Sequence, residues 1–234
     1  MSTKTAFARS FDLFRSRLQP TDQLSDGDET MNTPGDNLPY VSFDTHYIYH
    51  PAWATRVVKK INPAKHIDVG STLRFAAQLS AFLPVEFYDY RPAPLKLSSL
   101  FSGRTDLCAM HFADSSIQSI SCMHTIEHVG LGRYGDAIDP TGDLKAASEL
   151  QRVIAPGGHL ILVTPVGRPR VMYNAHRIYS YEQIISMFNT LQLFEFSLIP
   201  DNALQKGMIV NASPSLVPGQ QYGCGCFWFK KMPA

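Results

Sequence analysis

The fold class of this chain is decided by the stretch from Thr105 to Gly167, TDLCAMHFADSSIQSISCMHTIEHVGLGRYGDAIDPTGDLKAASELQRVIAPGGHLILVTPVG. Two short apolar runs in it, 117–123 and 159–163, are bounded by polar or turn residues and are predicted to be buried strands. Residues 143–154 between them have helical spacing, and the glycines at 157 and 158 are expected to end that helix. The apolar residues of this helix share one face: Leu144, Ala147, Leu150 and Ile154. A strand, a helix and a second strand in this order form a parallel crossover unit, which predicts an α/β fold.

The alternation of strands and helices continues on both sides of this stretch. Further strands are predicted at 66–70, at 85–88 and within 95–106, and further helices at 51–61, 71–82 and 181–189. The helix at 51–61 is predicted to start at Pro51, because proline suits the first helical turn. The final two strands, 191–199 and 222–230, are predicted to form an antiparallel pair at the sheet edge. Residues 166–179 lack periodicity and are predicted to be a loop at the carboxyl ends of the strands, where open α/β sheets bind ligands.

The first 44 residues differ in character from the rest of the chain. A helix is expected over 4–18, with one apolar side formed by Phe7, Phe11, Phe14 and Leu18. Such a stripe needs a partner surface, which is either the domain itself or a second subunit in a homodimer. Residues 21–40 contain five acidic residues and no lysine or arginine, which is typical of a mobile linker. We therefore predict an N-terminal extension over 1–44, made of a short helix and a mobile acidic linker, and a folded domain over 45–234.

Composition limits the class of protein. The chain of 234 residues is 44% hydrophobic, which supports a sizeable core, and its net charge of +1 is unlike the basic excess of nucleic-acid-binding proteins. No apolar run reaches the roughly 18 residues that a membrane span requires. The N-terminus lacks the apolar core of a signal peptide. We therefore expect a cytoplasmic protein with no membrane span and no nucleic-acid partner.

The cysteines give no recognisable metal motif. Cys108 and Cys122 lie in the apolar central region and are expected to behave as small hydrophobic residues. Cys224-Gly-Cys226 is not by itself a zinc spacing, and two cysteines on one face of a strand are the simpler interpretation. No metal site is therefore predicted.

Four motifs follow one another along the central part of the chain. Asp106 is an acid at the end of a predicted strand, and it is followed by MHFADSSIQSI, by HTIEHV and by ELQRVIAPGGHLILVTP. Together they resemble class I S-adenosylmethionine-dependent methyltransferases, over roughly residues 45–200. The resemblance implies a Rossmann-like fold: a mostly parallel seven-stranded sheet with helices on both faces and an antiparallel last strand. Two further runs, EHVGLGRYGDAIDPTGDLKAASEL and NAHRIYS, resemble a bacterial methyltransferase-like subgroup often associated with surface-polysaccharide genes.

The resemblance implies S-adenosylmethionine as the cofactor. Asp68 and Gly70 match the start of the family's first motif, whose glycine lets the backbone approach the methionine part of the cofactor. Thr72 and Arg74 then stand where further glycines are usual, although with Ser71 they could donate hydrogen bonds instead. Asp89, about 20 residues past the glycine turn, would accept hydrogen bonds from both ribose hydroxyls. Asp106, after the third strand, would accept a hydrogen bond from the adenine amino group. The full set expected at the cofactor is Asp68, Gly70, Ser71, Arg74, Asp89, Tyr90, Asp106, Leu107 and His124.

Methyl transfer to oxygen or nitrogen requires an aligned donor and acceptor and often the removal of a proton, for which histidine is suited near neutral pH. The resemblance places three histidines near the reacting atoms: His124 and His128 after the strand at 117–123, and His176 in the predicted loop. Each is a candidate base, and a structural role is the alternative for each. Arg177 is a candidate for binding a phosphate or carboxylate of the acceptor, with a solvated surface position as the alternative.

An aromatic segment, 44–53, precedes the first predicted strand. It either covers the active site, with Tyr47, Tyr49 or His50 touching a ligand, or packs on the sheet. Both interpretations are compatible with a helix at this place, because in the family the helix before the first strand often borders the cofactor.

The function predicted from these residues is S-adenosylmethionine-dependent methyl transfer to a hydroxyl of a sugar or surface-glycan precursor. The partner would then be a small-molecule or glycan acceptor. The alternative is a catalytically inactive methyltransferase-like binding or scaffold protein in polysaccharide biosynthesis, which the missing glycines favour. A nucleotide-dependent dehydrogenase is disfavoured, because no G-x-G-x-x-G follows the first predicted strand.

Overall fold

The structure, a computed structural model, describes residues 3–19 and 39–233. The chain divides into two compact units, Met1–Asp44 and Thr45–Ala234. In the first unit the predicted helix is present as α1 (Thr3–Arg15), and the rings of Phe7 and Phe11 are stacked with centroids 6.3 Å apart. Apart from residues 39 and 40, the predicted acidic linker at 21–40 lies outside the described residues.

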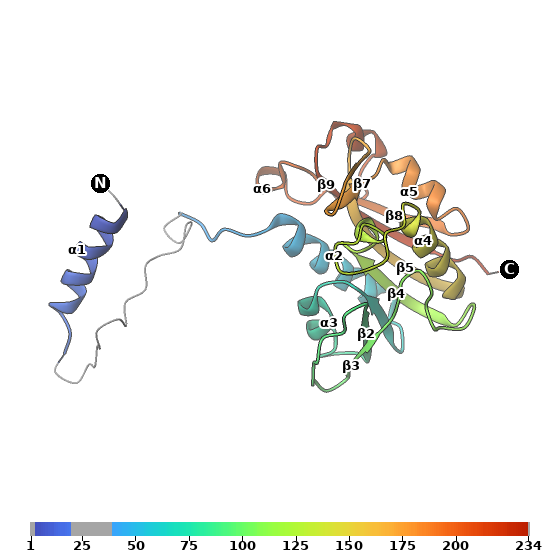
Figure 1. Ribbon diagram of the computed structural model, residues 1–234, viewed down its shortest axis with the longest axis horizontal. Helices are drawn as coiled ribbons and strands as arrows, with labels where there is room; N and C mark the ends of the chain where they lie inside the picture. Colours follow the sequence, from blue (N-terminus) through green and yellow to red (C-terminus); the bar gives the residue numbers. More distant parts are fainter. Residues whose placement is uncertain (1–2, 20–38, 234) are drawn as a thin grey trace. The chain divides into compact units, whose positions relative to one another are not determined.

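Seven strands of the second unit form one sheet in the order β3-β2-β1-β4-β5-β9-β8 (Figure 1). Their bounds are β1 (His66–Val69), β2 (Val85–Asp89), β3 (Leu100–Arg104), β4 (Ile117–Met123), β5 (Ile154–Val166), β8 (Gln192–Ile199) and β9 (Gly223–Lys230). Neighbouring strands are parallel except at β9, which is antiparallel to both β5 and β8. The prediction of a mostly parallel seven-stranded sheet with an antiparallel last strand is confirmed.

Helices cover both faces of the sheet, as predicted. One face carries α2 (Thr45–Ile61), α3 (Leu73–Leu79) and α6 (Ala203–Lys206), and the other carries α4 (Gly142–Val153) and α5 (Tyr181–Met187). Side chains along β5 alternate between the two cores, because successive residues of a strand point to opposite faces. Leu160 and Leu162 belong to the core under α4 and α5, whereas Ile161 and Val163 belong to the core under α2 and α3.

Two element ends differ from the predictions. The helix expected to start at Pro51 starts at Thr45, and Pro51 lies inside it. The additional turn packs Tyr49 against the apolar core under α2. The glycines expected to end α4 belong to β5 instead, since α4 already ends at Val153. Gly157 has a φ of +80°, and its N–H donates to the carbonyl of Lys231 at 2.8 Å, so the Pro-Gly-Gly run forms the irregular start of a strand.

The prediction of a loop over 166–179 is wrong for its central part. This segment contains an antiparallel hairpin of β6 (Arg170–Met172) and β7 (His176–Ile178), which forms a separate two-stranded sheet. Asn174 has a φ of +54° in the turn, a conformation that asparagine tolerates better than most residues. Strands of three residues are too short to show an alternating pattern, which explains why the sequence did not reveal them.

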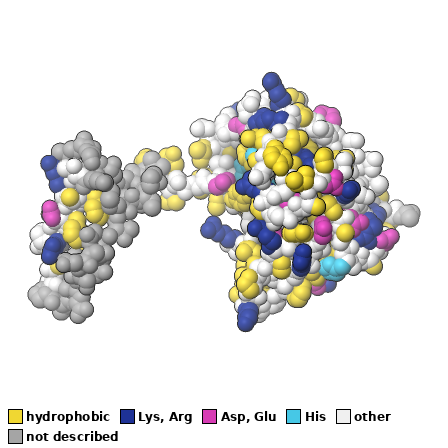
Figure 2. All heavy atoms as spheres, viewed as in Figure 1, with side chains coloured by type: hydrophobic (Ala, Val, Ile, Leu, Met, Phe, Trp, Pro, Cys, Tyr) yellow, Lys and Arg dark blue, Asp and Glu magenta, His cyan; other side chains and the backbone are white. Residues whose placement is uncertain are grey.

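The long connection at 200–221 contains α6 and a 3-10 helix, η2 (Pro214–Gly219), and another 3-10 helix, η1 (Ile126–His128), follows β4. Figure 2 shows basic and acidic side chains interspersed on the visible face of the second unit, in keeping with the net charge of +1. Within residues 3–19 and 39–233, every helix is too short or too polar to cross a bilayer.

Candidate functional site

The carboxyl ends of β1, β2, β3 and β4 border a cleft of about 570 Å³. Open α/β sheets bind ligands at this edge, and the volume is typical of a small-molecule site. Except for Asp68, all residues predicted to bind the cofactor line it: Gly70, Ser71, Arg74, Asp89, Tyr90, Asp106, Leu107 and His124. Of the predicted catalytic residues, His124 and His128 line the cleft, whereas His176 and Arg177 do not.

The turn after β1 brings the backbone close to the neighbouring strand end. Gly70 has a φ of +70°, and a Cβ added there would lie 2.5 Å from the side chain of Thr125. Only glycine fits this combination of conformation and close approach. The two hydroxyls that follow support the turn: Ser71 Oγ accepts from the N–H of Met123 at 3.1 Å, and Thr72 Oγ1 accepts from the N–H of Phe75 at 3.2 Å, which caps α3.

Asp68 points into the sheet and not into the cleft, which corrects its assignment as a direct cofactor contact. The side chain is 0% exposed, and its Oδ1 accepts from the hydroxyl of Ser121. That hydroxyl also lies 2.9 Å from Nε2 of His66, whose Nδ1 lies 2.8 Å from the hydroxyl of Ser119. Burial raises the pKa of Asp68 to about 7 and lowers the pKa of His66 to about 3. The group is therefore a buried, mostly uncharged link between β1 and β4.

The Asp68→Asn variant is expected to change how stability depends on pH. The folded chain binds the carboxyl proton more tightly than the unfolded chain, so the stability contributed by Asp68 is complete below its ordinary pKa of 3.8 and is lost as pH rises through about 7. In urea unfolding between these limits, the wild type should lose up to about 1.4 kcal/mol per pH unit relative to the variant. His66 is present in both proteins, so its own titration cancels in the difference. A difference that does not vary with pH would show that this carboxyl ionises normally.

Two acids stand at the ends of neighbouring strands and line the cleft. Asp89 is the last residue of β2, and its Oδ1 accepts from the N–H of Arg91 at 2.8 Å. Asp106 follows β3, and its Oδ1 accepts from the N–H of Cys108 at 2.8 Å. These bonds fix the direction of each carboxylate, and the second oxygen of each has no partner among the described residues.

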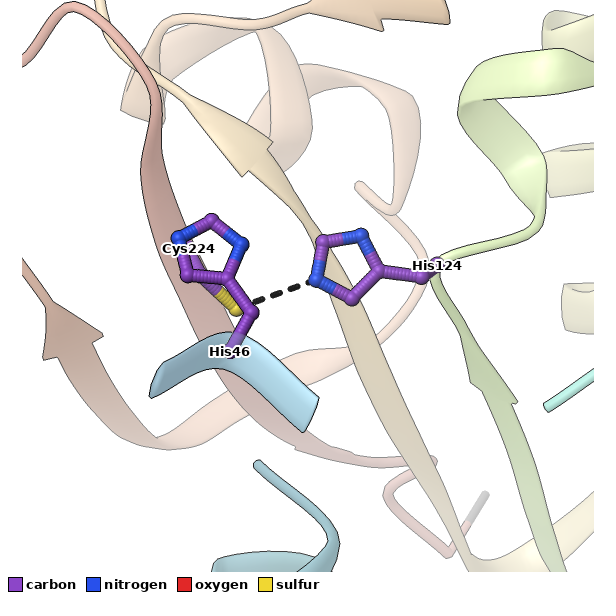
Figure 3. Close-up of side chains that lie close together, drawn as sticks. All are labelled: His46, His124 and Cys224. Atoms are coloured by element: carbon purple, nitrogen blue, oxygen red, sulfur yellow. Dashed lines mark hydrogen bonds between the residues drawn. The ribbon is translucent and has the colours of Figure 1, made fainter. Parts of the chain in front are cut away.

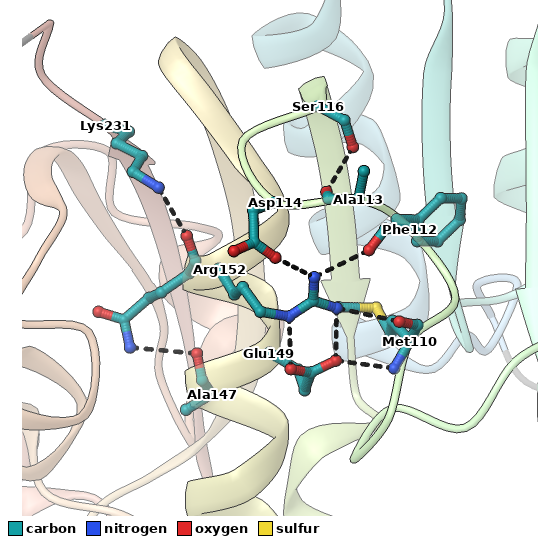
Figure 4. A network of polar contacts seen from close by, with 10 residues as sticks. Met110, Phe112, Ala113, Asp114, Ser116, Ala147, Glu149, Arg152 and Lys231 are labelled. Carbon is teal, nitrogen blue, oxygen red and sulfur yellow. Dashed lines mark hydrogen bonds and ion pairs between the residues drawn. The ribbon is translucent and has the colours of Figure 1, made fainter.

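The loop between Asp106 and β4 is attached to α4 by Arg152 (Figure 4). The guanidinium donates to the carbonyls of Met110 and Phe112 at 2.9 and 2.8 Å. It also pairs with both oxygens of Glu149 at 2.7 Å and with Asp114 at 2.6 Å. One side chain thus fixes three points of the loop, because a guanidinium presents several donors in a rigid plane.

His124 lies directly after β4 with a φ of +52°, which is uncommon for a residue other than glycine. Its Nδ1 lies 2.9 Å from Oε1 of the buried Glu127, and its Nε2 lies 3.4 Å from Sγ of Cys224. Burial lowers the pKa of His124, but its contacts with Cys224 and Glu127 outweigh burial and raise that pKa to about 10. Burial also raises the pKa of Cys224, so near neutral pH the charge that favours protonated His124 comes from Glu127.

The two ring nitrogens of His128, four residues after His124, have different surroundings from those of His124. Nδ1 of His128 is hydrogen-bonded to the carbonyl of Ala175 in the turn of the β6–β7 hairpin. A carbonyl only accepts, so Nδ1 carries a proton, and in the neutral ring Nε2 is the nitrogen with the lone pair. Nε2 lies 3.8 Å from Oε1 of Glu127, and the side chain is 15% exposed at the cleft.

Arg177 is buried in the fold, which does not support its assignment to the acceptor. Its guanidinium donates to the carbonyls of Val129 and Pro140 at 2.7 and 3.2 Å and lies 3.4 Å from Asp143. His176, before it in β7, packs against Tyr222 with ring centroids 4.9 Å apart. Its Nε2 is buried without a hydrogen-bond partner.

The loop at 129–139 lines the cleft with residues that were not identified from the sequence. Asp136 accepts hydrogen bonds from the N–H groups of Gly130, Gly132 and Tyr134 at 2.9, 3.4 and 3.1 Å. The guanidinium of Arg91 lies 4.5 Å from the ring centroid of Tyr134, so the loops after β2 and β4 meet beside the cleft. The run GLGRYGD could have indicated this loop, since closely spaced glycines before an acid are typical of a turn whose N–H groups bind a carboxylate.

The aromatic segment before β1 lies partly at the cleft and partly against the core. Tyr47 lines the cleft, whereas Tyr49 packs against the core under α2. His50 is fully buried, and within the described part of the chain its ring has no side-chain hydrogen-bond partner. The start of α2 is therefore partly a wall of the cleft and partly core.

Comparison with family models and curated proteins gives one match. A family described as "Caenorhabditis protein of unknown function, DUF268" matches residues 96–202. Comparison with curated proteins gives no match.

Solved structures of methyltransferases have a similar fold. The 1,6-didemethyltoxoflavin-N1-methyltransferase of Burkholderia thailandensis, solved with 1,6-didemethyltoxoflavin and S-adenosylhomocysteine, is 10% identical with a TM-score of 0.56 and covers 78% of each chain. The N-methyltransferase NodS of Bradyrhizobium japonicum WM9, solved with S-adenosylhomocysteine, is 14% identical with a TM-score of 0.51 and covers 78% of this chain and 87% of that chain.

The [4+2]-cyclase SpnF is also similar, with 13% identity, a TM-score of 0.50, and 77% of this chain and 82% of that chain covered. At these identities the similarity establishes the Rossmann-like methyltransferase fold. It does not establish the reaction, because one fold supports different chemistries.

Proposed function

We propose that the chain is an S-adenosylmethionine-dependent methyltransferase that binds its cofactor in the cleft at the carboxyl ends of β1 to β4. The observation that supports this most is the pair of oriented acids, Asp89 after β2 and Asp106 after β3, on the wall of that cleft. The carboxylate of Asp89 is suited to accept hydrogen bonds from the ribose hydroxyls, and that of Asp106 is suited to accept one from the adenine amino group. The glycine turn at Gly70 lies beside them, where the methionine part would be bound.

The acceptor in this proposal is a hydroxyl of a sugar or surface-glycan precursor. Three tyrosines line the cleft: Tyr47, Tyr90 and Tyr134. Sugars have apolar C–H faces and hydroxyl edges, and a tyrosine supplies both an apolar ring and a hydroxyl. The resemblance of the segment around Glu127 to proteins associated with surface-polysaccharide genes supports the same class of acceptor.

The alternative is a binding or scaffold protein that retains the fold without the reaction, which the replacement of glycines by Thr72 and Arg74 favours. Calorimetry of the full chain with S-adenosylmethionine and S-adenosylhomocysteine separates the two. Binding of either compound supports the methyltransferase, and a folded chain that binds neither supports the scaffold. Transfer of a labelled methyl group to a panel of free sugars and sugar nucleotides then identifies the acceptor; labelling of none of them would contradict the sugar class.

Replacing Asp89 by alanine is expected to weaken S-adenosylmethionine binding roughly tenfold to a few hundredfold. Hydrogen bonds to a charged acceptor contribute about 1.5–3 kcal/mol, and the ribose would lose them. Calorimetry of the variant measures the loss directly. Glu182→Ala removes one carboxylate at the start of α5, away from the cleft, and should bind like the wild type. Unchanged affinity in a folded Asp89→Ala variant would remove this residue from the site.

A further inference from the structure

Three side chains that can ligate a metal converge beside the cleft (Figure 3). His46 comes from the start of α2, His124 from the end of β4, and Cys224 from the start of β9. One ligand atom from each lies within 4.8 Å of the others. His124 and Cys224 are buried and His46 is half-buried, so the group is largely shielded from water. The parallel order of β4 and β5 and the antiparallel return of β9 bring these distant parts of the sequence together.

The distances suit a tetrahedral ion. Zinc binds imidazole nitrogen at about 2.0–2.1 Å and thiolate sulfur at about 2.3 Å, so neighbouring ligand atoms in a tetrahedron are about 3.3–3.6 Å apart. Nε2 of His124 and Sγ of Cys224 are already 3.4 Å apart. A nitrogen of His46 lies within 4.8 Å of both atoms. The His46 ring is stacked on that of His124 at an interplanar angle of 16°, so its side chain must turn for its lone pair to point at the same ion.

The surroundings of His124 are those of a metal ligand. Its Nδ1 is hydrogen-bonded to Glu127, which is 0% exposed, and its Nε2 is directed at the thiol. A histidine that binds a metal through one nitrogen commonly donates its other N–H to a carboxylate, which fixes the ring and makes the ligating nitrogen more basic. The positive φ of His124 fits a side chain that the local structure holds in an uncommon position.

A second, independent observation comes from His50, one turn after His46 on α2. Its ring centroid is 5.1 Å from that of His124. One of its two buried nitrogens interacts with the backbone of His46, and the other has no hydrogen-bond partner among the described residues. Buried polar atoms nearly always have a partner, which can be a bound ion or its water. The unsatisfied nitrogen of His50, on a ring that packs against His124, is therefore consistent with a polar occupant at this place.

We propose that His46, His124 and Cys224 bind one Zn²⁺ ion. Two imidazoles and a thiolate match the ligands that zinc prefers, whereas Mg²⁺ and Ca²⁺ require oxygen ligands. The cysteine binds as the thiolate and His124 binds through a deprotonated Nε2, so the thiol proton and the proton on Nε2 are both released to solvent when the ion enters. Three protein ligands leave the fourth position for a water molecule, as in zinc sites that are not closed structural sites. This metal site does not depend on the proposed methyl transfer.

The test uses the full chain without an affinity tag, stripped by a chelator and then titrated with Zn²⁺ and with Co²⁺. We expect one ion per chain, and Co²⁺ should produce the absorption bands of a tetrahedral site together with a thiolate-to-cobalt charge-transfer band. Cys224→Ser should abolish the charge-transfer band. Cys226→Ser is the matched control, because this cysteine is equally buried on the same strand and is not among the three ligands. It should retain the full stoichiometry and spectrum.

Two more variants keep the proposal testable when Cys224→Ser does not fold. His46→Gln changes a half-buried residue at a helix start and should weaken zinc binding at least tenfold in competition with a chromophoric chelator. Glu127→Gln removes the charge behind His124 and should weaken it about 10–100-fold. The proposal is overturned when the wild-type chain binds no stoichiometric zinc, or when His46→Gln and Cys226→Ser bind zinc equally well. Calorimetry with S-adenosylmethionine on the stripped chain reports the proposed function separately.

Discussion

Replacing Asp143 by alanine is expected to lower the free energy of unfolding by about 3–5 kcal/mol. The carboxylate lies 3.4 Å from the guanidinium of Arg177, and the two side chains are only 8% and 6% exposed. It also accepts from the hydroxyl of Tyr179 at 2.9 Å. The variant would leave a buried cation without its counter-ion and a buried hydroxyl without its acceptor. The interactions with this carboxylate help to offset the free energy of removing both groups from water, so its loss is expected to be strongly destabilising.

Denaturant unfolding at neutral pH measures this effect, and two controls interpret it. Lys145→Ala, two residues further along α4, breaks an exposed pair with Asp139 and should leave stability nearly unchanged. The double variant Asp143→Leu, Arg177→Met removes both charges and should recover much of the stability lost by Asp143→Ala. If Asp143→Ala is as stable as the wild type, the carbonyls of Val129 and Pro140 are sufficient partners for the Arg177 guanidinium, and the ion pair does not stabilise the fold.

The strands were predictable because burial in a parallel sheet leaves a direct trace in the sequence. The runs of β4 and β5 are largely buried on both faces, and each pairs with neighbours on both sides. The hairpin of β6 and β7 leaves no such trace. Its position depends on contacts with distant segments, such as the bond between His128 and the carbonyl of Ala175. Local pattern contains no information about such contacts.

The site residues that could be predicted are those at strand ends, because the end of a strand places a side chain at the edge of the sheet. Asp89 and Asp106 stand at or after strand ends, so they lie at the cleft whatever the details of packing. Asp68 is inside β1, opposite Ser121 of β4, and whether such a side chain meets a ligand or the sheet interior depends on register. The cluster of His46, His124 and Cys224 was not predictable, because its members come from three elements that only the tertiary fold brings together.

The largest effect on turnover is expected from His128. His128→Ala should lower the single-turnover rate of methyl transfer about 10²–10⁴-fold, the usual contribution of a positioned base. Among the three candidate histidines, His128 lines the cleft with its Nδ1 bonded to a carbonyl, which leaves Nε2 as the nitrogen that can accept a proton. Both ring nitrogens of His124 already face protein partners, Glu127 and Cys224. His176 does not line the cleft.

Glu127 explains why His128 can accept a proton in a partly buried place. Its Oε1 lies 3.8 Å from Nε2 of His128, so the imidazolium formed by proton transfer would have a carboxylate close by. In the proposed transfer, the acceptor would lose its proton as the methyl group is transferred, and the positive charge would move from the sulfonium to the imidazolium. The histidine then returns the proton to solvent through its exposed edge.

The measurement requires the acceptor found in the sugar panel, with S-adenosylmethionine saturating and enzyme in excess. His128→Ala should retain its affinity for S-adenosylmethionine, and added imidazole should restore part of the rate, which a purely structural defect would not allow. His159→Ala is the matched control, because this histidine is bonded to Trp228 and lies outside the cleft lining. If His128→Ala keeps a near-normal rate while His124→Ala or His176→Ala loses it, the base is assigned to the wrong histidine. If all three variants keep near-normal rates, histidine does not remove the proton, and alignment of donor and acceptor in the cleft must supply the rate enhancement.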